Sequence, residues 1–356
     1  PKSFDKQEFP KVIGKMLKMN RVFSGIRPSG KLHLGNYLGA IKNWVDLQNV
    51  PDIDLRSAEG FGEARRAIFA VVDYHGITTP FDPKTYKQQV ADTILDYLAI
   101  GLDPKKVLLV RQSKIPAHTE LGWILGTITP VSWLDRLPTY KEKLEETHGK
   151  YTHLGLLAYP VLMAADILVY KSNLVPIGDD QKAHIDITNE IAKKFNHMFG
   201  PTFEPVKAHK AEGERIKSLQ NPAKKMSKTG DEGIALSDPP DIIREKIKKA
   251  VTDSGKEVVF DTDKKSAISN LMTIHHLLSK NSIKEIEKKY GGKSYVEFKN
   301  DLAEVIINFL TPFQEKRKEL ENDLIYVEDI LTESEEQARV IANSTLTEVK
   351  QKMGLI

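Results

Sequence analysis

The sequence predicts an α/β protein in which a Rossmann-like, doubly wound parallel sheet is followed by a helical C-terminal domain. Through the first part of the chain, short apolar runs alternate with longer amphipathic stretches, the pattern of strands and crossover helices. From Pro239 onward the pattern is helical and charged. With 356 residues, 40% of them hydrophobic, the chain is long enough for one large domain and a smaller one.

Strands and helices are expected to alternate in the first domain. The strand candidates are apolar runs at residues 21–26, 67–72, 107–110 and 174–177. The helix candidates carry apolar side chains at helical spacing, at 36–48, 83–100, 119–127, 133–146, 154–170 and 180–199. Ligands of doubly wound sheets bind beyond the carboxyl ends of the strands. The 27–30 turn, Asp73 and Gly178 fall at such ends.

Three segments are predicted along the chain: a helical extension at 1–20, the sheet domain at 21–235 and the helical domain at 236–356. A polar stretch at 49–66 interrupts the sheet domain between a helix and a strand. It is long for such a connection and is interpreted as an insertion or a surface loop of unassigned purpose.

Composition excludes several classes of site. The sequence has no cysteine, which excludes disulfides, thiolate catalysis and Cys-ligated metal sites, and no metal site is predicted. The lysine-rich N-terminus lacks the apolar region of a secretory signal. Asp166 and Pro160 interrupt the longest apolar run, so no membrane span is expected. A cytoplasmic protein is predicted; the net charge of +3 is compatible with a nucleic-acid partner.

The first motif is KLHLGNYLGA at residues 31–40. Gly35 lacks a Cβ where a nucleotide could pack against the backbone. His33 and Asn36 lie three residues apart at the start of a predicted helix, whose N-terminus favours phosphate oxygens, so both side chains are expected to point at one anion. The alternative is a surface histidine followed by a turn.

The second motif is KKMSKTG at residues 224–230. Lys225 and Lys228 flank Met-Ser on a predicted mobile loop and are suited to pairing with pyrophosphate. Charge on the leaving phosphates grows as the α-phosphorus is attacked, so lysines placed there stabilise the transition state more than the ground state. The alternative is a solvated lysine patch.

The two motifs in this order resemble the signature pair of the class I aminoacyl-tRNA synthetases. Further segments, including VVDYHGIT, YPVLMAADILVY, NLVPIGDDQKAHI and AVTDSG, are similar to tryptophanyl-tRNA synthetases of the bacterial type, in their order and spacing over about residues 21–353. The resemblance implies a Rossmann-like catalytic domain and a helical domain that binds the tRNA anticodon, where Arg244, Lys246, Lys248 and Lys249 are candidates for phosphate contacts.

Residues 159–166 carry the argument for tryptophan. The related tyrosine enzymes have Tyr-x3-Gln-x2-Asp here, whereas this chain has Tyr159, Met163 and Asp166 at that spacing. Methionine offers an apolar, polarizable surface that suits an indole face. An aspartate accepts from the donor-only indole N–H, and the resemblance assigns Asp166 that role. The alternative is a carboxylate that pairs within a helical bundle.

The resemblance also implies the other site residues. The catalytic residues would be His33, Asn36, Lys225 and Lys228. The ATP-binding residues would be Arg27, Pro28, Ser29, Gly35, Asn36, Gly178, Asp179, Asp180, Ile216, Lys225, Met226, Ser227, Lys228 and Thr229. The tryptophan-binding residues would be Asp166, Phe23, His75, Tyr159, Met163 and Gln181, and Lys143 would be an additional phosphate ligand.

Three features depart from the family. Arg27 stands where many members have Gln, and Thr139-Tyr140 replaces a more usual Gln-Phe, which leaves the roles of Lys141 and Lys143 open. The 49–66 segment is longer than usual.

The implied reaction activates L-tryptophan with ATP to tryptophanyl-adenylate and pyrophosphate, and then transfers tryptophan to tRNA(Trp) with release of AMP. Mg²⁺ is expected on the phosphates, held mainly by them and by water. A homodimer is expected from the family. Three other functions remain open: a tyrosine-specific synthetase, a cofactor adenylyltransferase, and a tRNA-binding paralogue without catalysis.

Overall fold

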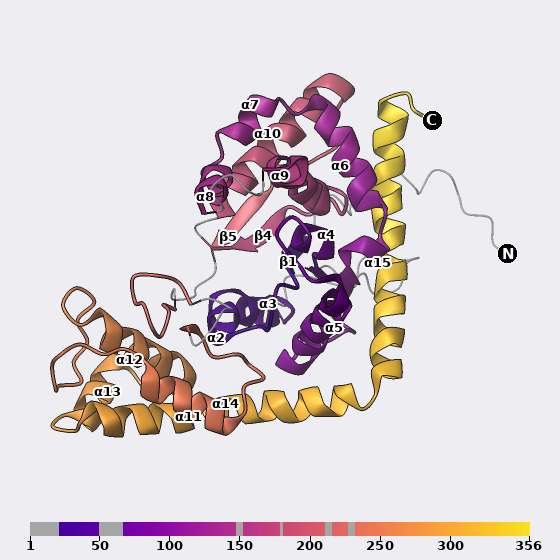
Figure 1. Cartoon of the computed structure of the whole chain (residues 1–356). Coiled ribbons are helices and arrows are strands. Elements are labelled where there is room, and N and C mark those ends of the chain that lie inside the picture. The colour runs from indigo at the N-terminus through magenta and orange to yellow at the C-terminus, as the bar shows by residue number, and fades with distance from the viewer. Residues whose placement is uncertain (1–20, 50–66, 147–151, 179–180, 211–215, 227–231) are drawn as a thin grey trace.

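A computed structural model of the chain describes residues 21–49, 67–146, 152–178, 181–210, 216–226 and 232–356. Within them lies a five-stranded sheet in the order β3-β2-β1-β4-β5, with every neighbouring pair parallel. Figure 1 labels β1, β4 and β5 of this sheet. The strands are β1 (Val22–Ile26), β2 (Ala67–Val71), β3 (Val107–Arg111), β4 (Leu174–Ile177) and β5 (Lys207–Lys210). The order confirms the predicted Rossmann-like, doubly wound fold.

The four predicted strands are present, with ends that differ by at most one residue. Strand β5 was not predicted from the sequence; among the described strands it pairs with β4 and lies at the edge of the sheet. Its four residues, KAHK, are mostly polar, as is common in an edge strand, where lysines discourage pairing with another chain.

Helices cover both faces of the sheet. In β2, Phe69 points into one core, where its ring stacks on Trp44 with centroids 4.6 Å apart. Its neighbours Ile68 and Ala70 point into the other core. This alternation follows from the two-residue repeat of a strand. The helices of this part are α2 (Leu34–Asn36), η1 (Tyr37–Ile41), α3 (Lys42–Leu47), α4 (Asp73–Gly76), α5 (Pro83–Ile100), η2 (Gln112–Lys114), α6 (Ala117–Ile128), α7 (Val131–Asp135), α8 (Pro138–Glu146), α9 (Leu154–Leu168) and α10 (Lys182–Phe199).

Two predicted helices are divided in the structure. The segment 36–48 forms the end of α2, the π-helical turn η1 and then α3. The segment 133–146 breaks between α7 and α8. Pro138 begins α8, and a proline is accepted at the first position of a helix because its missing N–H would have no partner there.

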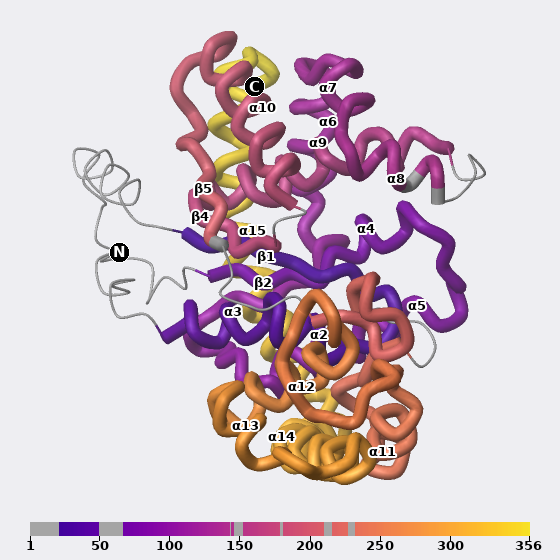
Figure 2. The backbone as a smooth tube through the Cα atoms, turned by 90° about the vertical axis from the view of Figure 1, so that its left-hand side faces the viewer, coloured from indigo at the N-terminus to yellow at the C-terminus, as the bar shows by residue number. Residues whose placement is uncertain are grey.

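The C-terminal part is helical, as predicted. Its helices are α11 (Pro240–Lys249), α12 (Ser266–Ser279), α13 (Ile283–Tyr290), α14 (Tyr295–Glu321) and α15 (Leu324–Lys352). Helices α11–α14 gather at one end of the molecule, on the side away from α6, α7 and α10 (Figure 2).

Helix α15 turns back from this group and runs along the sheet domain beside β3 and α6 (Figure 1). Arg111, the last residue of β3, holds it there: its Nε lies 2.6 Å from Glu335 Oε1 and its Nη2 lies 2.8 Å from Glu328 Oε1. The helix thus covers the exposed edge of β3. The boundary near residue 235 stays a prediction, and the segments 1–20 and 50–66 lie outside the described residues.

Candidate active site

His33 and Asn36 form a reciprocal cap at the start of α2. Asn36 N donates to His33 Nδ1 at 3.2 Å, and His33 N donates to Asn36 Oδ1 at 3.2 Å. His33 is buried, which is inconsistent with the surface-histidine alternative. These bonds engage His33 Nδ1 and Asn36 Oδ1, and the expectation that both side chains also point at one anion stays a prediction. Their capping shapes the helix start at which an anion would bind.

The two sequence motifs meet in the structure. A Cβ built on Gly35 would lie 3.0 Å from His33 Nδ1 and 3.2 Å from Met226 Cβ, so the missing side chain lets the second motif pack against the first. The chain that follows the second motif also returns to the first. Leu34 N donates to Ile234 O at 2.8 Å. Segments far apart in sequence therefore form one wall.

The second motif begins on a short hairpin. Lys217 and Lys225 face each other in an antiparallel bridge, and Met226 N donates to Ile216 O at 3.1 Å. Ile216 and Met226 are buried, whereas Lys225 is exposed. The predicted ligands Ser227, Lys228 and Thr229 lie outside the described residues, as do Asp179 and Asp180.

Predicted ATP contacts follow the carboxyl ends of the central strands. Arg27, Pro28 and Ser29 come after β1, and Gly178 comes after β4. These strands are neighbours at the point where the strand order reverses, which is where doubly wound sheets bind ligands. A Cβ on Gly76 would lie 3.2 Å from Pro28 Cδ, so this loop contacts α4, the helix that carries His75.

A buried carboxylate lies at the same end of the sheet. Asp166 in α9 is 1% exposed, and both of its oxygens are bound. His75 Nε2 lies 2.8 Å from Oδ2, His118 Nδ1 lies 2.7 Å from Oδ1, and Gln112 Nε2 donates to both oxygens at 2.8 and 2.9 Å. Two residues predicted to bind tryptophan, His75 and Asp166, thus contact each other.

These donors keep Asp166 ionised. Burial alone would raise the pKa of the carboxyl group, but His118 and His75 outweigh it and lower the pKa to about 2. A buried aspartate that stays charged at neutral pH is a strong hydrogen-bond acceptor. It is suited to a ligand group that can only donate.

Tyr159 and Met163 lie on the same helix as Asp166, one turn apart, so all three are on one face of α9. The Tyr159 ring stands edge-on to His75, with centroids 6.2 Å apart. Its hydroxyl lies 2.8 Å from His184 Nε2 and donates to Thr139 Oγ1 at 2.9 Å. Thr139, one of the departures from the family pattern, therefore helps to orient Tyr159.

Two predicted pocket residues occupy less direct positions. Phe23 is buried and its ring stacks on Tyr170, with centroids 5.7 Å apart, in the core behind Asp166. Gln181 is the N-cap of α10 and follows Gly178 at the end of β4. Their contact with a ligand stays a prediction, and the side chain of Lys143 lies outside what the structure describes.

Comparison with known proteins connects this geometry to a family. The sequence model of the family described as "tRNA synthetases class I (W and Y)" matches residues 16–311, which is most of the chain. The chain belongs to this family.

Relatives match at full length. The tryptophan–tRNA ligase of Caldanaerobacter subterraneus subsp. tengcongensis is 44% identical over 343 residues, 95% of this chain and 99% of that protein. The tryptophan–tRNA ligase of Helicobacter pylori is 43% identical over 342 residues, 94% of this chain and 99% of that protein. The solved structure of tryptophanyl-tRNA synthetase from Campylobacter jejuni complexed with ADP and tryptophan has a TM-score of 0.79 and 32% identity, covering 94% and 99%.

Within this class I synthetase, sequence reasoning missed Gln112 and His118. Gln112 directly follows β3, so a polar residue at a strand end could have identified it, as it identified Asp73. Its Oε1 accepts from Tyr74 N at 3.0 Å, which ties the loop after β2 to Asp166. His118 lies inside an apolar helix, and its spacing carries no signal for a contact with a residue 48 positions later.

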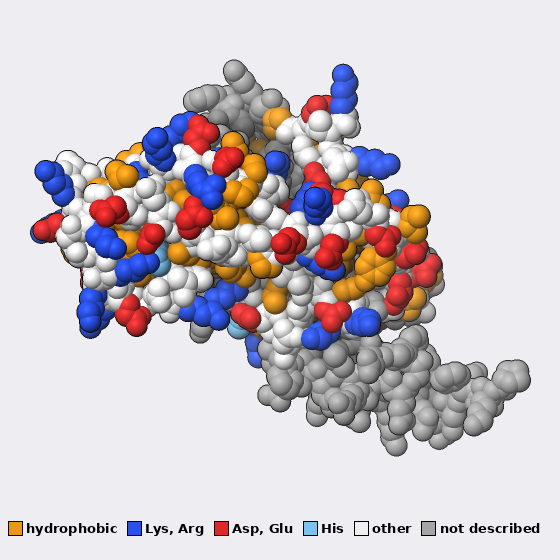
Figure 3. All heavy atoms as spheres, turned by 90° about the horizontal axis from the view of Figure 1, so that it is seen from below, with side chains coloured by type: hydrophobic (Ala, Val, Ile, Leu, Met, Phe, Trp, Pro, Cys, Tyr) orange, Lys and Arg blue, Asp and Glu red, His pale blue; other side chains and the backbone are white. Residues whose placement is uncertain are grey.

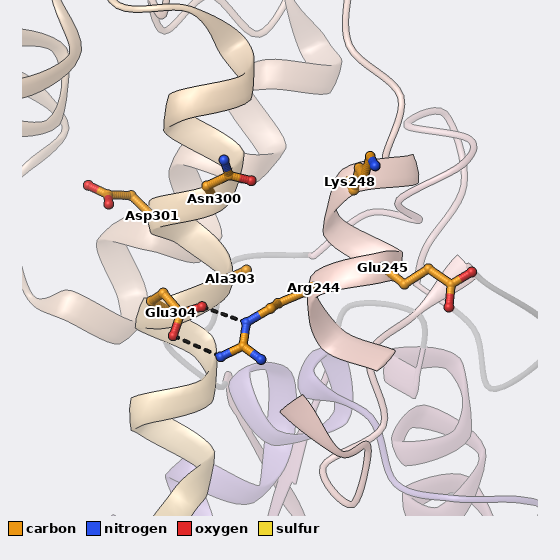
Figure 4. A pocket seen from close by; sticks show the side chains of 7 residues that line it. All are labelled: Arg244, Glu245, Lys248, Asn300, Asp301, Ala303 and Glu304. Atoms are coloured by element: carbon orange, nitrogen blue, oxygen red, sulfur yellow. Dashed lines mark hydrogen bonds and ion pairs between the residues drawn. The ribbon is translucent and has the colours of Figure 1, made fainter. Parts of the chain in front are cut away.

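A surface pocket lies in the helical domain, away from this site. It is a cavity of about 420 Å³ between α11 and α14. Arg244 reaches across from α11 to Glu304 on α14, with Nε 2.7 Å from Oε1 (Figure 4). The cavity is lined by residues of both charges.

Proposed function

We propose that this chain is a tryptophan–tRNA ligase. It activates L-tryptophan with ATP and transfers the amino acid to tRNA(Trp). The observation that carries the proposal is the contact of Gly35 with Met226, which joins the two nucleotide motifs at the end of the sheet that also holds Asp166. The curated relatives with this name match over nearly the whole chain.

ATP would lie across the wall formed by the two motifs, which pack against each other where Gly35 lacks a Cβ. The start of α2, with His33 and Asn36, is suited to phosphate oxygens. Lys225 and Lys228 would hold the β- and γ-phosphates. Mg²⁺ would be bound by the phosphates and water, since the chemistry needs charge neutralisation rather than a protein cage.

Tryptophan would lie against His75, Tyr159 and Met163, with its indole N–H on Asp166. The ionised carboxylate and the apolar Met163 favour indole over phenol. In the tyrosine enzymes a glutamine at the position of Met163 gives the phenol hydroxyl a second hydrogen-bond partner, and methionine does not. The amino acid carboxylate then attacks the α-phosphorus and displaces pyrophosphate. No side chain is needed as a covalent nucleophile; positioning and charge stabilisation supply the rate.

The helical domain would bind the tRNA anticodon. Three of the four basic candidates already have acidic partners: Arg244 pairs with Glu304, Lys246 with Asp238, and Lys249 with Glu245. Basic and acidic side chains are interspersed over the face seen from below (Figure 3). Phosphate contacts there would therefore exchange one ion pair for another, and Lys248 is the best remaining candidate of the four.

A homodimer is supported by exposed apolar side chains on α6, α7 and α9. Trp123 in α6 is 77% exposed, Val131 at the start of α7 is 64% exposed, and Leu154 at the start of α9 is 77% exposed. Contiguous exposed apolar groups mark contact surfaces, and we propose that these three side chains belong to one such surface. A location in the reducing cytoplasm agrees with a sequence that has no cysteine. Among the described residues no helix is both long and apolar enough to span a membrane.

The test is aminoacylation of purified tRNA(Trp) and tRNA(Tyr) transcripts with radiolabelled amino acids. The proposal predicts charging of tRNA(Trp) with tryptophan and no charging of tRNA(Tyr) with tyrosine. Lys228→Ala should keep tRNA binding and slow adenylate formation by about 10²-fold or more. Binding of tRNA without any charging by the wild-type protein would instead support the non-catalytic paralogue.

A further inference from the structure

His118 lies behind the proposed tryptophan pocket, fully buried on α6. Its two ring nitrogens have different partners. Nδ1 lies 2.7 Å from Asp166 Oδ1, and Nε2 lies 2.8 Å from the Tyr170 hydroxyl. Tyr170 is also fully buried, and its ring stands edge-on to the imidazole. Tyr170, His118 and Asp166 are thus connected by hydrogen bonds, with the Asp166 carboxylate at one end.

The direction of these hydrogen bonds follows from chemistry. An ionised carboxylate only accepts, so His118 donates its Nδ1–H to Asp166. Burial raises the pKa of Tyr170 well above its usual value, so the phenol keeps its proton and can donate to Nε2. In this arrangement the tyrosine fixes the tautomer of the imidazole, and the imidazole fixes the carboxylate.

The position of His118 separates it from the ligand. His75 also binds Asp166, but its side chain is 9% exposed and its ring faces Tyr159 on the pocket side. The His118 side chain is 0% exposed and contacts Phe23 and Tyr170 in the core. His118 is therefore placed to act on a bound amino acid through Asp166 rather than by direct contact.

We propose that His118, supported by Tyr170, is a positioning residue for the selection of tryptophan: it holds the carboxylate of Asp166 in the orientation that accepts the indole N–H. This inference rests on the proposed role of Asp166 in the function above. Removing the His118 donor leaves a buried carboxylate with one fewer partner, which can rotate toward Gln112 and away from the ligand.

The measurement is the ratio of kcat/KM for tryptophan to kcat/KM for 3-(1-benzothiophen-3-yl)alanine in ATP–pyrophosphate exchange. The analogue has sulfur in place of the indole N–H and nearly the same shape, so the ratio reports the hydrogen bond to Asp166. In His118→Phe the ratio is expected to fall roughly 10- to 100-fold, the range for a hydrogen bond to a charged group. Tyr170→Phe removes only the hydroxyl and should lower the ratio about 3- to 10-fold.

A conservative variant separates positioning from packing. The amide nitrogen of His118→Asn can replace Nδ1 as the donor, so this variant should recover most of the selectivity that His118→Phe loses. Matched controls are His275→Phe and Tyr290→Phe in the helical domain, where a buried histidine also lies 3.3 Å from a tyrosine hydroxyl. Both controls should keep the wild-type ratio.

The outcomes distinguish the positioning role of His118 from the proposed role of Asp166 as the acceptor of the indole N–H. If Asp166→Ala keeps the wild-type ratio, Asp166 does not accept the indole N–H, and both its proposed role and the positioning role of His118 fail. If Asp166→Ala loses the ratio while His118→Phe and Tyr170→Phe keep it, only the positioning role is overturned. If His118→Phe does not fold, the Tyr170→Phe variant tests the proposal instead. A wild-type ratio in Tyr170→Phe overturns the positioning role, and a lowered ratio with an unchanged KM for ATP supports it.

Discussion

The contact between the two nucleotide motifs predicts a sharp response to one added methyl group. In Gly35→Ala the new Cβ would lie 3.0 Å from His33 Nδ1, 3.1 Å from His33 Cε1 and 3.2 Å from Met226 Cβ. These distances are a few tenths of an ångström shorter than ordinary van der Waals contact, so Met226 or the His33 cap must move. Overpacking of this kind costs about 1–3 kcal/mol. Alanine offsets about 0.5–1 kcal/mol of this, because it is the better helix former.

The assay is ATP–pyrophosphate exchange as a function of ATP concentration, together with thermal unfolding. Because a displacement of about 1 Å can lower a rate by about 10²-fold, kcat/KM for ATP should fall at least about tenfold in Gly35→Ala, with KM for tryptophan nearly unchanged. The matched control is Gly39→Ala in the next helical turn, where the added Cβ would meet nothing within 4 Å. It should keep activity and gain stability. Equal ATP kinetics in the two variants would refute the idea that Gly35 is needed for the contact between the motifs.

Three further predictions concern stability and assembly. The pKa of Asp166 falls from 3.8 to about 2 on folding, so its stabilisation is complete above pH 3.8 and is lost as the pH falls toward 2. The urea-unfolding free energy of wild type relative to Asp166→Asn should therefore drop by about 1 kcal/mol between pH 5 and pH 3, and a pH-independent difference would contradict the ionised assignment. Glu335→Gln leaves the half-buried Arg111 with a neutral partner and should lower the free energy of unfolding in urea by about 2–4 kcal/mol. Glu328→Gln, at the exposed end of the same arginine, should lower it by under about 1 kcal/mol. Equal costs in the two variants would argue against the Arg111–Glu335 pair as the contact that holds α15. Trp123→Glu should shift a dimer to a monomer in sedimentation velocity, and an unchanged dimer would place the interface elsewhere.

Local sequence patterns were sufficient for most of the fold. The four apolar strands and the helices between them were predicted because burial on both faces of a parallel sheet demands continuous apolar runs. The strand β5 was missed because KAHK has neither an apolar run nor alternation, and it forms where β4 offers a free edge. The docking of α15 was also beyond local reasoning, since it depends on the buried ion pair between Arg111 and Glu335, 224 residues apart.

The candidate site was predicted where motifs fix chemistry locally, and missed where it depends on packing. Gly35 and Met226 were named from their motifs, but the contact between them is a property of the fold. Asp166 was singled out from its spacing to Tyr159 and Met163, at which the resemblance assigns it the indole N–H. Its partners could not be predicted from spacing, because Gln112 and His118 come from a different strand end and a different helix.

The most direct test of the central claim is amino-acid-dependent ATP–pyrophosphate exchange with tryptophan, tyrosine and phenylalanine side by side. We expect exchange with tryptophan, and rates about 10⁴- to 10⁵-fold lower with phenylalanine, which lacks the N–H donor that Asp166 would accept. Exchange driven by tyrosine would contradict the assignment of Met163 and Asp166 as an indole site. No exchange with any of the three, in protein shown to be folded, would contradict the claim that the joined motifs activate an amino acid.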